Sequence, residues 1–230
     1  MLELFPEGFA EEERRGGVKL VAFTDEAGAR RLRASFGEVT TVPVLPGWDE
    51  AWKRFHVPVV VGSLWIGPPW EQPPSELTPV VIDPGRAFGT GSHPTTRLCV
   101  EVLQELELGS VLDLGCGSGV LAIAAAKLGF EPVTAADHDE AALAATRANA
   151  HRNSVELEVR RADALDSLPE ADLVVANIDL GTLERLAPKL RCRRALTSGY
   201  YEGEPLSLPG FRRVDRRTED DWVADLFARG

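Results

Sequence analysis

The sequence predicts an α/β fold, a Rossmann-like doubly wound sheet that ends in an antiparallel hairpin. Three observations predict it. From residue 80 onward, short apolar runs alternate with helical patterns, which is typical of right-handed βαβ units and a parallel sheet. A glycine-rich turn over 115–119 joins a buried strand to an apolar helical run. Two strand-like runs around a polar turn close the chain, as expected for a hairpin at one edge of the sheet.

Two smaller regions precede the predicted sheet. Residues 1–47 predict a small α+β region, with a strand-like run over 18–23 and a charged, helix-like run over 25–36. The segment 48–79 is rich in proline and tryptophan and contains a strand-like run over 57–66. Because tryptophans are costly to leave in water, we expect this linker to pack on another part of the molecule. Its tryptophans are Trp48, Trp52, Trp65 and Trp70.

The third region, residues 80–230, carries the predicted sheet. Strands are expected over 110–114, 132–136, 155–159, 172–176 and 194–198. Helices are expected between them over 94–107, 119–128, 139–151 and 179–190. The C-terminal hairpin is expected from strands over 211–217 and 222–228, joined by a polar turn over 218–221. The alternation therefore predicts one domain with helices on both faces of a sheet.

Composition narrows the class of protein. The chain has 230 residues, of which 44% are hydrophobic, so it can bury a sizeable core. Its net charge of −11 and pI of about 4.9 disfavour direct contact with nucleic acid and suit a basic partner. Cys99, Cys116 and Cys192 are far apart and form no Cys-x-x-Cys pair. We therefore expect no disulfide framework, no metal site and a reducing compartment.

The chain shows no targeting or membrane signal. Its N-terminus lacks a basic region followed by an apolar stretch, so no signal peptide is expected. The longest apolar run, 57–70, is broken by Pro58, Pro68 and Pro69 and is too short to span a bilayer. These features predict a cytoplasmic protein without a membrane partner.

The glycine turn is the main ligand signal. Gly115, Gly117 and Gly119 alternate between a strand and a helix, the geometry that brings bare backbone against a nucleotide-like ligand. A dinucleotide fingerprint has the spacing G-x-G-x-x-G/A, but here the third glycine comes one residue early and Val120 occupies the expected position. With Asp113 two residues ahead of the first glycine, the turn resembles motif I of the class I S-adenosylmethionine (SAM) methyltransferases.

Polar residues also follow the neighbouring strands, where ligands of open α/β sheets bind. Asp137 lies 22 residues beyond Gly115 and could accept hydrogen bonds from ribose hydroxyls. It could instead cap the next helix, although Asp139 is better placed to do so. Asp163 follows the third strand, either as a ligand contact or as an ordinary loop acid. In the superfamily that motif I resembles, an acid there meets the adenine amino group.

Asn177 is the candidate catalytic residue. Its side-chain amide lies at the tip of the fourth predicted strand, where it could accept a hydrogen bond from an amine and orient the lone pair. A turn-forming asparagine is the other interpretation. Many amino-methylating enzymes carry Asn-Pro-Pro-Tyr at this point, whereas this chain has Asn-Ile-Asp-Leu over 177–180.

A glycine-containing loop over 83–97 runs into a helix with Pro94 near its first turn. Such a loop could close over a ligand. Phe88 would then be an apolar cover and Thr96 a polar contact, with Thr90 a further candidate. His93 is interpreted as a helix-start residue, with a catalytic base as the alternative.

Together these segments resemble the PrmA family, the bacterial methyltransferases of ribosomal protein L11. The resemblance covers 48–230 and is carried by 88–96, 112–125, Asp137 and 174–178. It implies the class I methyltransferase form of the Rossmann-like fold and SAM as the cofactor. Thr96, Gly115, Asp137 and Asn177 match the family's SAM-contacting positions. The implied activity is methylation of lysine side chains and of the α-amine of L11 or another basic protein, by a chain expected to be monomeric.

The N-terminal region departs from the family pattern. Family members carry a complete ferredoxin-like βαββαβ domain that recognises the ribosomal protein, whereas 1–47 is too short and lacks the opening strand and helix. Three alternatives therefore stay open. The chain could be a class I methyltransferase with another protein or a small molecule as substrate, a nicotinamide oxidoreductase, or a binding module without activity.

Overall fold

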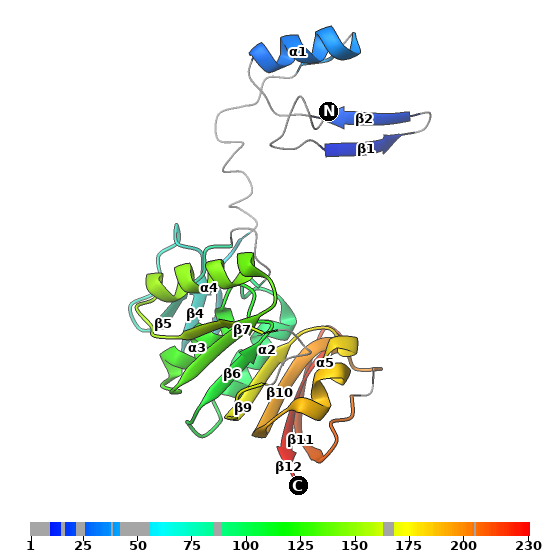
Figure 1. Ribbon diagram of the computed structural model, residues 1–230. Coiled ribbons are helices and arrows are strands. Elements are labelled where there is room, and N and C mark those ends of the chain that lie inside the picture. Colours follow the sequence, from blue (N-terminus) through cyan, green and yellow to red (C-terminus); the bar gives the residue numbers. More distant parts are fainter. Residues whose placement is uncertain are drawn as a thin grey trace. The chain divides into compact units, whose positions relative to one another are not determined.

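The computed structural model describes residues 10–14, 17–21, 26–37, 39–41, 56–84, 89–162, 168–204 and 206–230. The chain divides into two compact units, Met1–Ala51 and Trp52–Gly230. Figure 1 shows a hairpin and a helix in the first unit and the large sheet with its helices in the second.

The first unit contains an antiparallel hairpin and one helix. Strand β1 (Ala10–Arg14) pairs with β2 (Gly17–Val21), and helix α1 (Glu26–Phe36) follows. The predicted strand and helix of this region are both found, with shifted ends. The sequence analysis missed β1 because Ala-Glu-Glu-Glu-Arg has no apolar alternation, so only its pairing with β2 defines it as a strand.

The proline- and tryptophan-rich segment contributes a three-stranded sheet to the second unit. Its strands are β3 (Val59–Val61), β4 (Leu64–Gly67) and β5 (Thr78–Val81), with β4 antiparallel to β3 and parallel to β5. Leu64 and Val80 are fully buried in the same apolar cluster as helices of the large sheet. Trp65 is only 3% exposed, as expected for a packed tryptophan, whereas Trp48 and Trp52 lie outside the described residues.

The large sheet has seven strands in the order β11-β12-β10-β9-β6-β7-β8. Five strands, from β10 to β8 in that order, are parallel, and β12 runs antiparallel between β10 and β11. The predicted doubly wound sheet and C-terminal hairpin are thus confirmed. The strands are β6 (Val111–Leu114), β7 (Val133–Asp137), β8 (Glu158–Arg161), β9 (Ala171–Asn177), β10 (Cys192–Tyr201), β11 (Phe211–Glu219) and β12 (Trp222–Arg229).

Among the described residues, four α-helices cover this sheet. They are α2 (Pro94–Leu103), α3 (Val120–Leu128), α4 (Glu140–Arg152) and α5 (Leu180–Leu186), the last followed by a 3₁₀ turn over Ala187–Lys189. Helices α2, α3 and α4 pack on one face and α5 on the other (Figure 1). Neighbouring strand residues separate accordingly: Val111 joins the first apolar cluster and Leu112 the second.

Several predicted boundaries were wrong, among them the run over 57–66, which divides into β3 and β4. Local contacts explain two others. The strand expected over 155–159 begins only at Glu158, because the backbone N–H of Val155 still bonds to Ala150 at the end of α4. The helix expected over 94–107 ends at Leu103. There the side chain of Gln104 turns to the small sheet and accepts a hydrogen bond from the Ser63 N–H at 2.8 Å.

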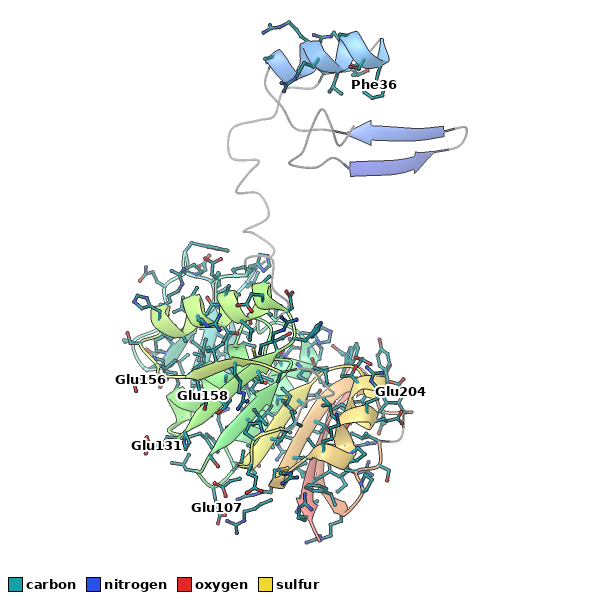
Figure 2. All side chains as sticks on the ribbon, viewed as in Figure 1. Phe36, Glu107, Glu131, Glu156, Glu158 and Glu204 are labelled. Atoms are coloured by element: carbon teal, nitrogen blue, oxygen red, sulfur yellow. The ribbon has the colours of Figure 1, made fainter. Side chains whose placement is uncertain are left out.

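Surface charge is distributed around the second unit. Figure 2 labels Glu107, Glu131, Glu156, Glu158 and Glu204, all at its outer surface. Among the helices that the structure describes, none combines the length and the apolar character needed to cross a membrane.

Candidate functional site

A cavity of about 1130 Å³ opens where the parallel strands end. Leu114 of β6, Asp137 of β7 and Asn177 of β9 all contribute to its lining, as do His93 and Thr96 from the start of α2. This is the edge of the sheet at which open α/β folds bind ligands. The cavity is at the upper end of the size range of small-molecule pockets, which is about 300–1,000 Å³.

The glycine turn lies along this cavity. Gly115, Gly117 and Gly119 have φ values of 72°, 54° and 83°, the left-handed region that favours glycine. Gly115 and Gly117 line the cavity, whereas Gly119 is the N-cap residue of α3 and is buried. A Cβ added to Gly115 would lie 2.4 Å from Cγ2 of Ile178. The turn therefore presents backbone to a ligand because glycine alone fits it.

Asp113 stabilises the glycine turn through helix α3. Its side chain is 2% exposed, and Oδ2 accepts a hydrogen bond from the Ala122 N–H in the first turn of α3 at 3.0 Å. Gly119 has no side chain to cap that helix, so this carboxyl satisfies one of its unpaired donors. Burial raises the pKa of Asp113 to about 7; the Ala122 N–H opposes the rise and the Asp137 carboxylate adds to it.

Asp137 connects the glycine turn with the end of β7. Oδ2 accepts a hydrogen bond from the Gly117 N–H at 3.0 Å, and Oδ1 accepts one from the Asp139 N–H at 3.0 Å. The cap of α4 is Asp139, whose side chain accepts from the Ala141 N–H, as the sequence indicated. Asp137 therefore lines the cavity without being the helix cap.

Helix α4 holds the turn through a buried polar face that the sequence analysis missed. Thr146 donates from Oγ1 to the Gly117 carbonyl at 3.0 Å, and Asn149 donates from Nδ2 to the Ser118 carbonyl at 3.0 Å. Asn149 also accepts from the Asp83 N–H at 3.0 Å. The signal available in the sequence was the spacing of Thr146 and Asn149, which places two polar side chains on the same face of a predicted helix. Without partners inside the protein, that face would lie in water.

Asn177 and Thr96 meet at the same cavity. Nδ2 of Asn177 lies 3.4 Å from Oγ1 of Thr96, which is 1% exposed in the first turn of α2. Residues from two distant parts of the chain therefore meet beside the glycine turn, and both line the cavity. The arrangement places the side-chain amide of Asn177 where a hydrogen-bond donor that enters the cavity could reach it.

His93 is the N-cap residue of α2, as the sequence indicated. Its Nδ1 accepts from the Thr95 N–H at 3.4 Å and lies 2.8 Å from the Thr95 hydroxyl. Partial burial and the nearby Arg97 lower the pKa of His93, which keeps the imidazole neutral near pH 7.

The other predicted contact residues lie in the loop over 83–97 and after the third predicted strand. Thr90 does not line the cavity, and its hydroxyl lies 3.1 Å from that of Ser92. Phe88 and Asp163 lie outside the described residues. Cys116 lines the cavity, but burial, aided by Asp113, raises the pKa of its thiol to about 12, which fits a small packing side chain.

Comparison with known proteins identifies relatives. A family model described as ribosomal protein L11 methyltransferase (PrmA) matches residues 30–201. A ribosomal protein L11 methyltransferase of Shewanella sp. (strain W3-18-1) is 42% identical over 192 residues, 78% of this chain and 61% of the relative. One from Vibrio campbellii is 48% identical over 150 residues, 63% of this chain and 51% of the relative. The chain thus spans less than two thirds of the length of these relatives.

Solved structures agree on the fold. A ribosomal protein L11 methylase from Lactobacillus delbrueckii subsp. bulgaricus has a TM-score of 0.66 and 29% identity, covering 75% of this chain and 98% of that one. The putative methyltransferase yhhF from Escherichia coli has a TM-score of 0.51 and 15% identity, covering 60% and 87%. Because the family match extends over most of the chain, the protein belongs to the PrmA family of ribosomal protein L11 methyltransferases.

Proposed function

We propose that the protein is a SAM-dependent protein N-methyltransferase that methylates lysine side chains, α-amino groups or both on ribosomal protein L11. One observation carries this proposal. The glycine turn, Asp137 and the Asn177–Thr96 pair all line a single cavity. The glycine turn and Asp137 suit a nucleoside-bearing cofactor, and the Asn177 amide suits an amine.

The residues proposed to hold the cofactor fit SAM. Gly115 and Gly117 have no Cβ, so a ligand in the cavity can approach their backbone closely. A side chain at position 115 is excluded because its Cβ would collide with Ile178. Oδ2 of Asp137 accepts the Gly117 N–H and has a further lone pair that can accept from a ribose hydroxyl. Asp113 supports the turn through α3, and Gly119 contributes through its conformation. Phe88 and Asp163 stay candidates for further contacts, and Thr90 stays one only from outside the cavity lining. When bound, SAM supplies a methyl group on a cationic sulfur that is a good leaving group.

Asn177 is the residue proposed to orient the amine. A lysine amine must first lose a proton, which costs about 4–5 kcal/mol at pH 7 for a pKa of about 10.4. Asn177 donates through Nδ2 to Thr96, so its carbonyl oxygen Oδ1 is the atom that can accept an N–H from the neutral amine. That bond would orient the lone pair for attack on the methyl group that the bound cofactor would supply, and the methylated nitrogen would release its extra proton to solvent.

The domain arrangement in this proposal follows the sequence. Residues 80–230 are the catalytic domain, 48–79 the linker and 1–47 a small α+β, ferredoxin-like region that recognises substrate. Its hairpin and following helix match the ββα order found within a βαββαβ domain. The acidic chain suits a basic protein substrate in the cytoplasm, with no nucleic acid or membrane partner, and we propose that it acts as a monomer.

Methyl transfer to purified L11 tests the function. The protein is incubated with SAM labelled in its methyl group and with L11, and the product is mapped by mass spectrometry. Label on lysine or α-amino nitrogens of L11 is the expected result. Absence of label on L11, with label on another component of a cell lysate, would assign a different substrate. Calorimetry with SAM and with NAD provides a separate reading, in which binding of NAD but not SAM would overturn the cofactor assignment.

A further inference from the structure

Three aromatic rings form a row that reaches the cavity. The ring centroids of His93 and Trp222 lie 4.9 Å apart at an interplanar angle of 70°. Those of Trp222 and Tyr201 lie 4.1 Å apart at 32°. His93 and Trp222 line the cavity, whereas Tyr201 is 49% exposed. The row therefore leads from the protein surface to the cavity that contains Asn177.

The strand register explains why these rings lie near Asn177. Asn177 at the end of β9 pairs with Ser198 of β10, and Tyr201 at the end of β10 pairs with Trp222 of β12. A bulge at Gly199 separates the two pairs. Its φ is 98°, and an added Cβ would lie 2.3 Å from the Ile178 carbonyl oxygen. The bulge thus brings the end of the hairpin close to the tip of β9.

The row is fixed in place from both sides. The Arg97 guanidinium at the start of α2 donates to the Glu219 carboxylate at the end of β11, with Nε 3.2 Å from Oε2. The Ser198 hydroxyl donates to the Val223 carbonyl at 2.6 Å. Trp222 itself packs on the large apolar cluster. These contacts hold the hairpin end against the helix that carries His93 and Thr96.

We propose that Tyr201, Trp222 and His93 form the wall along which the amine-bearing side chain of the substrate reaches Asn177. This inference rests on the proposed N-methyltransferase function and names the acceptor subsite within it. The rings give the four-carbon stem of a lysine an apolar surface, and aromatic rings attract an ammonium group. A neutral imidazole at the inner end avoids repulsion of that cation. Trp222 is then a positioning residue for the amine-bearing side chain of the substrate.

Charge at the outer end of the row fits the same ligand. The residues next to Tyr201 and Trp222 in the sequence carry exposed carboxylates: Glu202, Asp220 and Asp221. The Glu202 N–H donates to the Asp221 carbonyl at 2.9 Å, which joins the two turns that carry them. Glu204, labelled in Figure 2, follows on the same turn as Glu202. A cationic side chain would therefore meet negative charge before it meets the rings.

Fluorine NMR of the full chain labelled with 5-fluorotryptophan tests the wall. The Trp222 resonance is the one that disappears in Trp222→Phe. Nα-acetyl-lysine methylamide is the probe, and its norleucine analogue, which has the alkyl stem without the amine, is the matched compound. The lysine probe should shift the Trp222 resonance more than the norleucine probe does. Resonances of the buried Trp65 and of Trp70 should not move.

Kinetics supply the second readout. Trp222→Ala should raise KM for L11 about tenfold while the Kd for SAM changes less than about twofold, and Trp222→Phe should recover most of the loss. Trp70→Phe, outside the cavity, is the control and should leave both constants unchanged. An unmoved Trp222 resonance together with an unchanged KM in Trp222→Ala would overturn the inference.

The two proposals fail differently. If the wild type transfers methyl groups but Trp222 neither shifts nor affects KM, only the acceptor wall is wrong. If the lysine probe shifts Trp222 but no methyl group is transferred to any amine, the binding wall stands and the proposed function is wrong.

Discussion

The side-chain amide of Asn177 donates to the hydroxyl of Thr96 across 3.4 Å, although the two residues are 81 positions apart. The amide is therefore oriented by the first turn of α2 and not by the residues that follow it. This differs from the Asn-Pro-Pro-Tyr pattern expected of many amino-methylating enzymes, in which the neighbouring prolines stiffen the backbone. Here Ile178 and Asp179 follow, and Asp179 caps α5 through a bond from the Thr182 N–H at 3.0 Å.

Asn177→Ala should remove methyl transfer while leaving most of the SAM affinity. The variant lacks the acceptor that orients the amine, and loss of one such group costs roughly 100- to 1000-fold in kcat. Thr96→Val keeps the side-chain shape but frees the amide, so its kcat should fall by about tenfold. Transfer rates are measured with labelled SAM and affinities by calorimetry. Full activity in Asn177→Ala would sink the assignment of Asn177.

Asp137→Asn should weaken SAM binding, whereas Asp139→Asn should not. Hydrogen bonds to a charged group contribute about 1.5–3 kcal/mol, so Kd should rise roughly 10- to 150-fold in Asp137→Asn. Asp139 caps α4 from two positions away, and asparagine caps a helix as well as aspartate does. Calorimetry with SAM on both variants is the measurement. Equal losses would mean that both acids act by holding the loop.

The fold was predictable from the sequence because each buried strand and its helix are encoded locally. Strand β6 and helix α3 are mostly apolar runs separated by glycines, and their predicted and observed bounds differ by a residue. Strand β1 could not be predicted, because its residues are mostly charged and show no apolar alternation. Its backbone pairing with β2 is what defines it as a strand. The tryptophans indicated that the 48–79 segment packs on another part of the molecule, but its three-stranded sheet was not predicted, because it depends on burial of Leu64 and Val80 against distant helices.

The site was predictable only where residues follow strands. Asp137 and Asn177 were found because carboxyl ends of parallel strands meet at one edge of a sheet. Trp222 was not, since it begins a hairpin strand and reaches the cavity through the Gly199 bulge, a feature of register. Asn149 was missed for a related reason. Its partners, Ser118 and Asp83, are supplied by two other segments of the chain.

Asp113→Asn should flatten the pH dependence of stability. The pKa of this carboxyl is raised from 3.8 to about 7 in the folded protein, mainly by burial. The folded state therefore keeps a proton that the unfolded chain has already released. Stability from this group is fully present below about pH 4 and is lost as pH rises through about 7, by at most about 1.4 kcal/mol per pH unit.

Urea unfolding of wild type and Asp113→Asn from pH 5 to pH 8 measures this effect. The free energy of unfolding of the wild type should fall relative to that of the variant as pH rises. Asparagine can still accept the Ala122 N–H through its carbonyl oxygen, so the comparison isolates the ionisation. Parallel curves over this range would show that Asp113 does not titrate there.

Gly115→Ala should damage both stability and SAM binding, and Gly129→Ala provides its control. Both glycines have positive φ, 72° and 98°, so alanine at either position costs about 1–2 kcal/mol of backbone strain. At Gly129 the nearest atom to the new Cβ is 3.5 Å away, which is ordinary contact, whereas at Gly115 Cγ2 of Ile178 is 2.4 Å away. Gly115→Ala should therefore lose more stability in urea unfolding and, unlike Gly129→Ala, at least about tenfold in SAM affinity. Adding Ile178→Ala removes the Cγ2 contact, so in that background Gly115→Ala should cost no more stability than Gly129→Ala. An undiminished cost would place the defect in the turn itself and not in the contact with Ile178.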